Sequence, residues 1–371
     1  MDGFVTPTIA YEDAMTQLWC GDVIQTLRML EPESVQCVVT SPPYYGLRSY
    51  GSEPVEWECL NSCESHQFEI VGWQPQAGGQ GDASAKQVTN IGSQESQRPV
   101  ARGMCRWCNT WLGELGHEPT PAMYVEHLVM ILAEIRRVLR PDGIVFWNQG
   151  DSYAGAKVGN TEIYKNPKAV TSSFKKVLAP GQKAKDLMLI PERLAIACQD
   201  DGWYVRSRIA WCKKAPMPES VRDRPTQAWE HIWMLTKSDK YYWNFEDSQE
   251  PAVEKNKRGP APYKHVPFGG NNDGLARREP VAKRNMWSYW VIGPKPLKEA
   301  HFATFPPTIP EKCIRAGSRE GDVVLDPFSG AATTNMVAEQ LGRKSIGIEI
   351  NQGYIDIGLK RLGKQKEEVA A

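Results

Sequence analysis

The segment Thr40-Ser41-Pro42-Pro43-Tyr44 places a hydroxyl, two prolines and an aromatic ring directly after the apolar run 35–39. Such a short apolar run is typical of a buried strand in a parallel sheet. Each proline lacks a backbone N–H and favours an extended conformation in the residue before it. The carbonyls of Ser41 and Pro42 are therefore expected at the carboxyl end of a strand, where α/β sheets bind ligands. Acceptors beside a ring suit a flat group with an amine, but an ordinary strand-ending turn explains this segment equally well.

Two acidic residues near the other end of the chain follow the pattern of a nucleotide site. Residues 323–326 predict a strand ending at Asp326, followed by a loop of small residues, a helix over 335–341 and a strand over 345–350. Small residues let the backbone approach a ligand closely, and Glu349 near the end of the next strand can hold both hydroxyls of a ribose. The loop lacks a complete G-x-G-x-x-G. The prediction of a nucleotide site therefore rests on the order strand, loop, helix, strand and on the positions of Asp326 and Glu349 in it.

A third acidic residue, Asp22, lies between a short apolar stretch and the amphipathic segment 23–30. A carboxylate at this corner can accept from a ligand amine, but Asp is also a common helix N-cap, which is the favoured interpretation for the residue alone. His231 precedes an apolar strand over 232–235, so we expect a structural or hydrogen-bonding role for it.

Cysteine and histidine residues form two close pairs around a polar insertion. Cys63 and His66 have C-x2-H spacing, and Cys105 and Cys108 have C-x2-C spacing, which together supply four ligands for tetrahedral zinc; Cys59 is an alternative ligand. Residues 49–102 are poor in aliphatic side chains and cannot build a core, so a metal would stabilise them. Unlinked thiols are the alternative, and the paired spacing favours zinc.

Length and composition limit the class of protein. The 371 residues suffice for one large domain with insertions. Lys and Arg number 44, as do Asp and Glu, so net charge does not indicate a polyanionic partner. Nine cysteines, no export signal in the first 11 residues and no apolar run of membrane-spanning length predict a cytoplasmic protein without a membrane segment.

The remaining chain alternates between helical and strand patterns. Helical spacing covers 121–139 and 191–198, and apolar strands are predicted over 144–148 and 203–211. This alternation predicts an α/β fold with a mostly parallel sheet and helices on both faces.

Positive charge is concentrated between residues 255 and 298, where ten Lys or Arg stand against two acidic residues, with aromatic residues near the end. A basic, Gly- and Pro-rich segment with aromatic side chains is typical of a phosphate-contacting loop, although a solvated surface loop is the alternative. The candidate phosphate contacts are Lys255, Lys257, Arg258, Arg277, Arg278, Lys283 and Arg284.

Together, these motifs resemble the amino-methyltransferases of DNA, which use S-adenosylmethionine to methylate exocyclic amines of cytosine or adenine. Segment 40–44 resembles the catalytic motif of that family, 326–330 its cofactor loop, and 301–306 the segment that helps hold the methionine end of the cofactor. The catalytic motif comes first and the cofactor loop last, which is the order of the permuted beta-class subgroup. Ala331 departs from relatives that commonly have a second glycine, and we expect cofactor binding to survive. The Cys/His insertion and the residues after it, 111–121, also resemble a subset of these enzymes.

The resemblance, which covers nearly the whole chain, implies a circularly permuted, Rossmann-like methyltransferase fold. The catalytic part would comprise residues 11–48 and 118–245, the zinc-binding insertion 49–117, the target-recognition region 246–295 and the cofactor-binding part 296–364. The implied catalytic residues are Ser41, Pro42, Pro43 and Tyr44. The implied cofactor contacts are Asp22, Thr40, His301, Phe302, Thr304, Asp326, Pro327, Phe328, Gly330, Thr333, Thr334 and Glu349.

The implied reaction begins with flipping of the target base out of duplex DNA. Ser41 and Pro42 would accept hydrogen bonds from the amine, and Tyr44 would stack on the base. Serine at the first motif position goes mostly with cytosine in this family, so methylation of cytosine N4 is predicted, with adenine N6 as the alternative. An inactive DNA-binding protein and an RNA or protein amine methyltransferase are further alternatives. A cognate restriction endonuclease, and a monomeric or homodimeric state, are left open.

Overall fold

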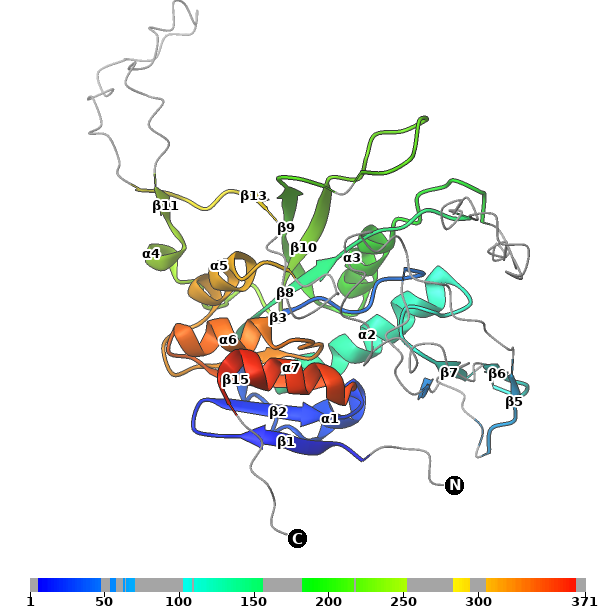
Figure 1. Cartoon of the computed structure of the whole chain (residues 1–371), viewed down its shortest axis with the longest axis horizontal. Coiled ribbons are helices and arrows are strands. Elements are labelled where there is room, and N and C mark those ends of the chain that lie inside the picture. The colour runs from blue at the N-terminus through cyan, green and yellow to red at the C-terminus, as the bar shows by residue number, and fades with distance from the viewer. Residues whose placement is uncertain are drawn as a thin grey trace, which may run out of the picture.

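The computed structural model describes residues 6–47, 54–57, 63, 65–70, 103–108, 110–155, 182–216, 218–251, 283–293 and 305–364. At its centre is a nine-stranded sheet with the order β1-β2-β15-β14-β3-β8-β10-β9-β13 (Figure 1). Five neighbouring strands run parallel: β2 (Thr16–Cys20), β15 (Lys344–Glu349), β14 (Val323–Asp326), β3 (Val35–Thr40) and β8 (Leu139–Gln149). The antiparallel pairs involve β1 (Thr8–Glu12), β10 (Trp229–Thr236) and β9 (Tyr204–Lys213), while β13 (Tyr289–Ile292) lies parallel to β9. The mostly parallel sheet is therefore confirmed.

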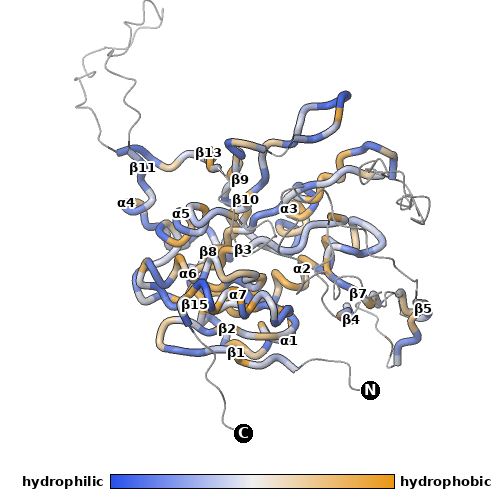
Figure 2. Tube along the Cα trace, viewed as in Figure 1, coloured by the Kyte–Doolittle hydropathy of each residue, from blue (hydrophilic) through white to orange (hydrophobic). Residues whose placement is uncertain are grey.

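Helices cover both faces of this sheet. On one face α2 (Pro121–Val138) packs between α1 (Val23–Met29) and α3 (Ile190–Asp200), and Val38 of β3 shares its apolar cluster with Leu128 of α2. On the other face lie α5 (Thr308–Gly317), α6 (Thr333–Gln340) and α7 (Gln352–Leu362), and Val39 shares a second cluster with Ile314 of α5. Every residue of β3 is buried, as its apolar run predicts. Apolar residues gather at the centre of the fold, near β3 and β8 (Figure 2).

One predicted boundary is wrong. Residues 140–143, Arg-Pro-Asp-Gly, lie between the predicted helix over 121–139 and the predicted strand over 144–148, but β8 begins at Leu139 and includes them. The register explains the difference, because Val35 pairs with Leu139 whereas Cys37 pairs with Ile144. The additional residues form an irregularity in the ladder, where Pro141 does not have to donate a hydrogen bond. Elsewhere, α3 and α6 differ from their predicted bounds by one or two residues.

The Cys/His insertion contributes a separate four-stranded sheet of order β4-β7-β6-β5. Its strands are short: β4 (Val55–Trp57), β7 (Trp111–Gly113), β6 (Gly103–Cys105) and β5 (Phe68–Ile70). Trp57 and Trp111 are buried within the main apolar cluster, so the base of the insertion packs on the methyltransferase-like core rather than on a core of its own. A two-stranded ladder of β11 (Glu250–Pro251) and β12 (Lys283–Arg284) follows the short helix α4 (Phe245–Ser248). None of the described helices is long and apolar enough to cross a membrane.

Candidate active site

The two ends of the chain meet at Asp326, the last residue of β14. The Thr40 hydroxyl donates to Asp326 Oδ1 at 2.7 Å, and the Thr334 hydroxyl donates to Oδ2 at 2.6 Å. Asp326 is only 2% exposed, and burial raises its pKa to about 6 against the opposing effect of these hydrogen bonds. The backbone N–H of Phe328 also donates to Oδ1 at 3.1 Å. Asp326 therefore joins the predicted catalytic segment to the predicted cofactor loop.

Glu349, at the end of β15, holds the same loop from the neighbouring strand. Its Oε2 accepts from the Gly330 N–H at 3.0 Å, and its Oε1 accepts from the Asn351 N–H at 2.9 Å. Desolvation raises the pKa of Glu349 to about 7. Gly330 has a φ of +50°, and a Cβ built on it would meet no atom within 4 Å, so this turn is tight and its outer side is open. A ligand can therefore approach the loop backbone.

Asp22 caps α1, as the favoured interpretation of the sequence predicts. Its side chain accepts from the Gln25 N–H at 2.9 Å, and burial raises its pKa. The Gly21 N–H donates to the Glu349 carbonyl at 3.1 Å, so the cap lies beside the strand end that carries Glu349. Asp22, Asp326 and Glu349 thus come from three adjacent strand ends.

The predicted catalytic segment is also anchored by residues of α2 and of the loop after β8. The Tyr124 hydroxyl of α2 donates to the Pro43 carbonyl at 2.6 Å. The ring of Tyr44 lies against Gly150, where any Cβ would clash with it. Pro42 is buried and Ser41 is half-buried. The turn is therefore held at the end of β3, with the Ser41 hydroxyl 3.4 Å from the amide nitrogen of Asn148 in β8.

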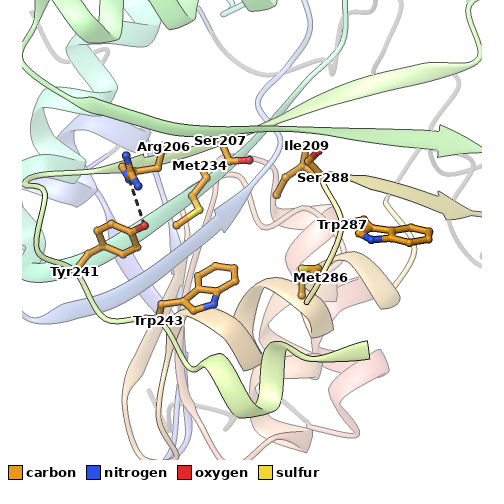
Figure 3. Close-up of a pocket in the computed structure, with 9 residues that line it drawn as sticks. All are labelled: Arg206, Ser207, Ile209, Met234, Tyr241, Trp243, Met286, Trp287 and Ser288. Atoms are coloured by element: carbon orange, nitrogen blue, oxygen red, sulfur yellow. Dashed lines mark hydrogen bonds between the residues drawn. The ribbon is translucent and has the colours of Figure 1, made fainter. Parts of the chain in front are cut away.

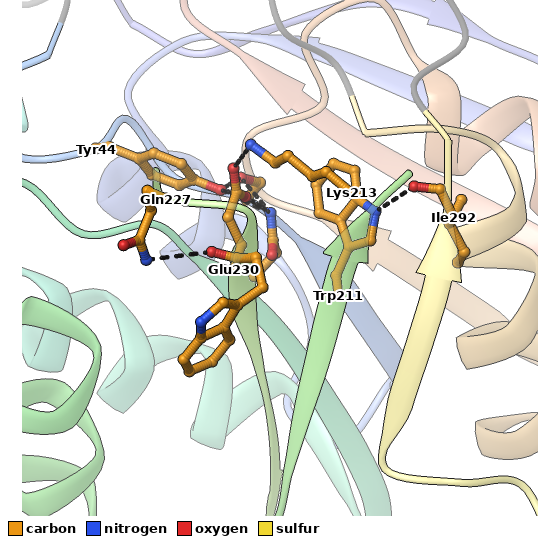
Figure 4. Close-up of polar contacts among 9 residues, drawn as sticks. Tyr44, Trp211, Lys213, Gln227, Glu230 and Ile292 are labelled. Atoms are coloured by element: carbon orange, nitrogen blue, oxygen red, sulfur yellow. Dashed lines mark hydrogen bonds and ion pairs between the residues drawn. The ribbon is translucent and has the colours of Figure 1, made fainter. Parts of the chain in front are cut away.

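A polar network joins Ser41 and Tyr44 to Glu230. Figure 4 shows how Tyr44, Glu230 and Lys213 of this network lie. The Ser41 hydroxyl donates to the Tyr44 oxygen at 3.2 Å, and the Tyr44 hydroxyl donates to Glu230 Oε2 at 2.7 Å. The Asn148 amide lies 2.7 Å from the Tyr44 oxygen and 3.1 Å from Glu230 Oε2. Lys213 forms an ion pair with the other oxygen of Glu230.

Three members of this network were not predicted from the sequence: Asn148, Glu230 and Lys213. All three lie near the ends of predicted strands, and a polar residue beside an apolar run was the available signal. Because β10 runs antiparallel to both β8 and β9, the start of β10 and the end of β9 reach the same edge as the end of β8, where Ser41 lies.

Two residues predicted to contact the cofactor, Thr333 and Phe328, contact other side chains of the protein. The Thr333 hydroxyl accepts from Arg361 at 2.9 Å, and Phe328 packs edge-on against Trp147 with 6.2 Å between ring centroids. Pro327 lies between Asp326, the last residue of β14, and Phe328. His301, Phe302 and Thr304 lie outside the described residues.

The basic candidates are only partly described. Arg284 forms an ion pair with Glu250 at 2.6 Å and stacks over Trp287 at 3.5 Å from the ring centroid, so part of its charge is already compensated. Lys283 is exposed on the same strand. Five candidates lie outside the described residues: Lys255, Lys257, Arg258, Arg277 and Arg278.

The four predicted zinc ligands converge. One ligand atom from each of Cys63, His66, Cys105 and Cys108 lies within 4.8 Å of all the others. Cys63 Sγ is 3.6 Å from Cys105 Sγ and 3.4 Å from Cys108 Sγ, and it is 3.3 Å from His66 Nδ1. Tetrahedral zinc with Zn–S bonds of about 2.3 Å separates its sulfur ligands by roughly 3.8 Å. The arrangement therefore fits zinc, while the alternative ligand Cys59 lies outside the described residues.

A hollow of about 250 Å³ lies over β9 and β10, away from these clusters (Figure 3). Its lining is mainly apolar, and two of its polar members, Arg206 and Tyr241, are hydrogen-bonded to each other at 3.2 Å. Its lining includes neither the predicted catalytic segment nor Asp326 and Glu349.

Comparisons with known proteins give matches over nearly the whole chain. The family model described as DNA methylase matches residues 35–360. The Type II methyltransferase M.XycI of Xanthomonas campestris pv. cyanopsidis is 34% identical over 95% of this chain and 89% of its own length. M.Cfr9I of Citrobacter freundii is also 34% identical, over 93% of this chain and 87% of its own.

A solved structure shows the same fold. The PvuII DNA methyltransferase, described as cytosine-N4-specific, is similar with a TM-score of 0.55 and 17% identity, over 98% of this chain and 90% of that one. The Rossmann-like methyltransferase fold that the motifs imply is therefore confirmed. The chain belongs to the N6/N4 DNA methylase family, as the resemblance of its motifs implies.

Proposed function

We propose that this Type II DNA amino-methyltransferase transfers a methyl group from S-adenosylmethionine to N4 of a flipped cytosine in duplex DNA. The observation that carries the proposal is the hydrogen bond from Thr40 to Asp326, which joins the segment of Ser41 to the small-residue loop. A base held at Ser41 would therefore lie next to a cofactor held at that loop. Methyl transfer needs this proximity more than it needs a nucleophilic side chain.

The residues present fit the cofactor. An ionised carboxylate offers about four lone-pair sites. In Glu349 two backbone N–H groups use one site on each oxygen, which leaves acceptor capacity for two ribose hydroxyls. Asp22, the loop 326–330 and Thr334 would surround the remainder, with His301, Phe302 and Thr304 as further proposed contacts. When bound, the cofactor supplies a methyl group activated by a sulfonium.

The affinity for S-adenosylmethionine is expected to rise with pH. The ribose hydroxyls donate to the ionised form of Glu349, and with a pKa of about 7 that form grows about fourfold between pH 6.5 and 8.5. The Kd should fall by a similar factor over this range, whereas Asp326, with a pKa of about 6, is already mostly ionised there. Titration calorimetry measures the effect, and Glu349→Gln should bind more weakly with a flat profile. A flat profile in the wild type would contradict the role of Glu349.

The catalytic segment would act by positioning and polarising the amine. The Ser41 hydroxyl and the Pro42 carbonyl would accept its two N–H bonds and direct its lone pair towards the methyl group. Tyr44 is fixed through its hydroxyl at 2.7 Å from Glu230 and through its ring on Gly150, and it would stack on the flipped base. Stacking of this kind contributes about 1–3 kcal/mol per base.

The methylated nucleoside is expected to be N4-methyldeoxycytidine. Ser41 is neutral and suits the cytosine amine in the family pattern, with the adenine N6 amine as the alternative. Methylated duplex DNA digested to nucleosides and separated by mass identifies the product, with Ser41→Ala enzyme as the blank. N6-methyldeoxyadenosine alone would refute the choice of cytosine, and parallel reactions with RNA and protein test the other substrate classes.

Two further assignments complete the proposal. We infer that Cys63, His66, Cys105 and Cys108 hold a structural zinc ion, on the strength of their convergence. We also infer that region 246–295 contacts duplex DNA, where exposed Lys283 and the partly neutralised Arg284 are its described basic residues at β12. We also propose the domain division given by the sequence, with a catalytic part over 11–48 and 118–245, an insertion over 49–117 and a cofactor-binding part over 296–364.

A further inference from the structure

We propose that Glu230 is the final proton acceptor of methyl transfer, reached from the substrate amine through Ser41 and Tyr44. The inference rests on the proposed function, because it needs an amine substrate at Ser41, and it applies to cytosine and adenine alike. It gives a function to a carboxylate that the catalytic motif does not contain.

The reaction requires such an acceptor. The amine nitrogen forms a bond to the methyl carbon, the carbon–sulfur bond breaks, and its electron pair stays on sulfur, which becomes a neutral thioether. The nitrogen then carries one proton too many. That N–H bond breaks with its electrons returning to nitrogen, and the proton has to leave a site enclosed by protein. Serine cannot keep it, because a protonated hydroxyl is a strong acid.

The hydrogen bonds already point in the direction of this transfer. The Ser41 hydroxyl donates to Tyr44 at 3.2 Å, and the Tyr44 hydroxyl donates to Glu230 Oε2 at 2.7 Å. Ser41 can therefore take the amine proton on its oxygen while its own proton passes to Tyr44 and that of Tyr44 passes to Glu230. Each oxygen gains one proton and loses one, and only Glu230 changes its protonation state.

Contacts from neighbouring strands fix the Glu230 carboxylate in position to accept a proton. Its side chain is 13% exposed, so it is enclosed but can pass the proton on to solvent. Lys213 pairs with Oε1, and the Asn148 amide lies 3.1 Å from Oε2, which leaves Oε2 turned to the Tyr44 hydroxyl. Each contact comes from a different strand, β9 or β8, so the position of Glu230 is fixed by the sheet itself.

Among the described residues, two other carboxylates near the site accept hydrogen bonds from groups outside the Ser41 network. Asp326 accepts from Thr40 and Thr334 on the cofactor side. Asp151 accepts from the backbone N–H groups of Ser152, Leu189 and Ile190, where it holds the start of α3. Within the described part of the chain, Glu230 is the carboxylate hydrogen-bonded into the network of Ser41.

The test measures the single-turnover rate of methyl transfer together with the affinities for cofactor and duplex. Glu230→Gln keeps the shape and removes the acceptor, and we expect the rate to fall by about 10²-fold or more while both Kd values stay within about twofold. Glu219→Gln is the matched control, because this partly exposed acid pairs with Arg224 outside the network, and it should keep the wild-type rate.

Chemical rescue separates proton transfer from mere positioning. In Glu230→Ala enzyme, added formate should restore part of the rate, and chloride at the same concentration should not. In the double variant that also carries Tyr44→Phe, formate should no longer restore the rate, because the hydroxyl that passes the proton on from Ser41 is missing. A Glu230→Gln rate near that of the wild type, or equal effects of formate and chloride, would overturn the proposal. If the wild type itself methylates no amine, the proposed function fails instead, so the two failures are distinguishable.

Discussion

Ser41→Ala enzyme is expected to transfer methyl groups to duplex DNA about 10²–10³-fold more slowly than the wild type in a single turnover, the range for losing one preorganised hydrogen-bonding group. The hydroxyl lies at the end of β3, 3.2 Å from the Tyr44 oxygen. It would contact the amine as charge develops there, so its removal affects the transition state more than the bound cofactor. The Kd for S-adenosylmethionine should therefore change by less than about twofold, because a removed group that acts only in the transition state leaves ground-state binding intact.

A matched serine tests whether this effect is specific. Ser34 precedes the same strand at its other end and donates to the Glu31 carbonyl at 2.7 Å, so Ser34→Ala makes the same chemical change away from the site. It should retain the wild-type rate. Quenched-flow measurement of tritiated methyl transfer provides both rates. Ser41→Ala activity within about threefold of the wild type would remove Ser41 from the site, because general positioning effects exceed that factor.

The part of this site that the sequence predicts is the part that lies on parallel strands. Ser41 follows β3, Asp326 ends β14 and Glu349 ends β15, and these strands are neighbours in the sheet. Carboxyl ends of parallel strands share an edge, so three motifs with clear strand patterns are enough to place them together. The Cys/His cluster could be predicted for a different reason. The two ligands within each C-x2-H or C-x2-C pair are close in the sequence, so their spacing alone places them near each other.

Glu230 could not be placed in the same way. It reaches the site only because β10 runs antiparallel to β8, with His231 paired with Gln149. Neither the direction of β10 nor its register follows from an apolar run, and a shift of one residue would turn Glu230 to the other face. Lys213 depends in addition on the register of β9 against β10. Glu230 and Lys213 were thus missed because their positions depend on antiparallel pairings, whereas Asn148 lies near the end of β8 in the parallel part of the sheet.

Replacement of Cys105 by serine is expected to abolish zinc binding and to open the insertion. Cys63 and Cys105 are 42 positions apart, so a metal held between them closes a long polar loop that has no core. Structural zinc contributes about 10–16 kcal/mol of apparent binding free energy in small domains. Elemental analysis should find one zinc per wild-type chain and none per Cys105→Ser chain. Cys212→Ser is the control, because this thiol lies outside the cluster.

The region that loses stability shows whether the zinc ion stabilises the insertion alone or the whole chain. Trp57 and Trp111 are buried in the main apolar cluster, and Trp57 stacks on His127 of α2 with 4.6 Å between ring centroids. Loss of zinc should therefore speed proteolysis between residues 58 and 110 while the core keeps most of its thermal stability. Wild-type protein purified without zinc, or equal proteolysis of the Cys105→Ser and Cys212→Ser variants, would contradict the metal site. Unfolding of the whole chain on chelation would instead show that the two tryptophans transmit the stabilisation by zinc to the methyltransferase core.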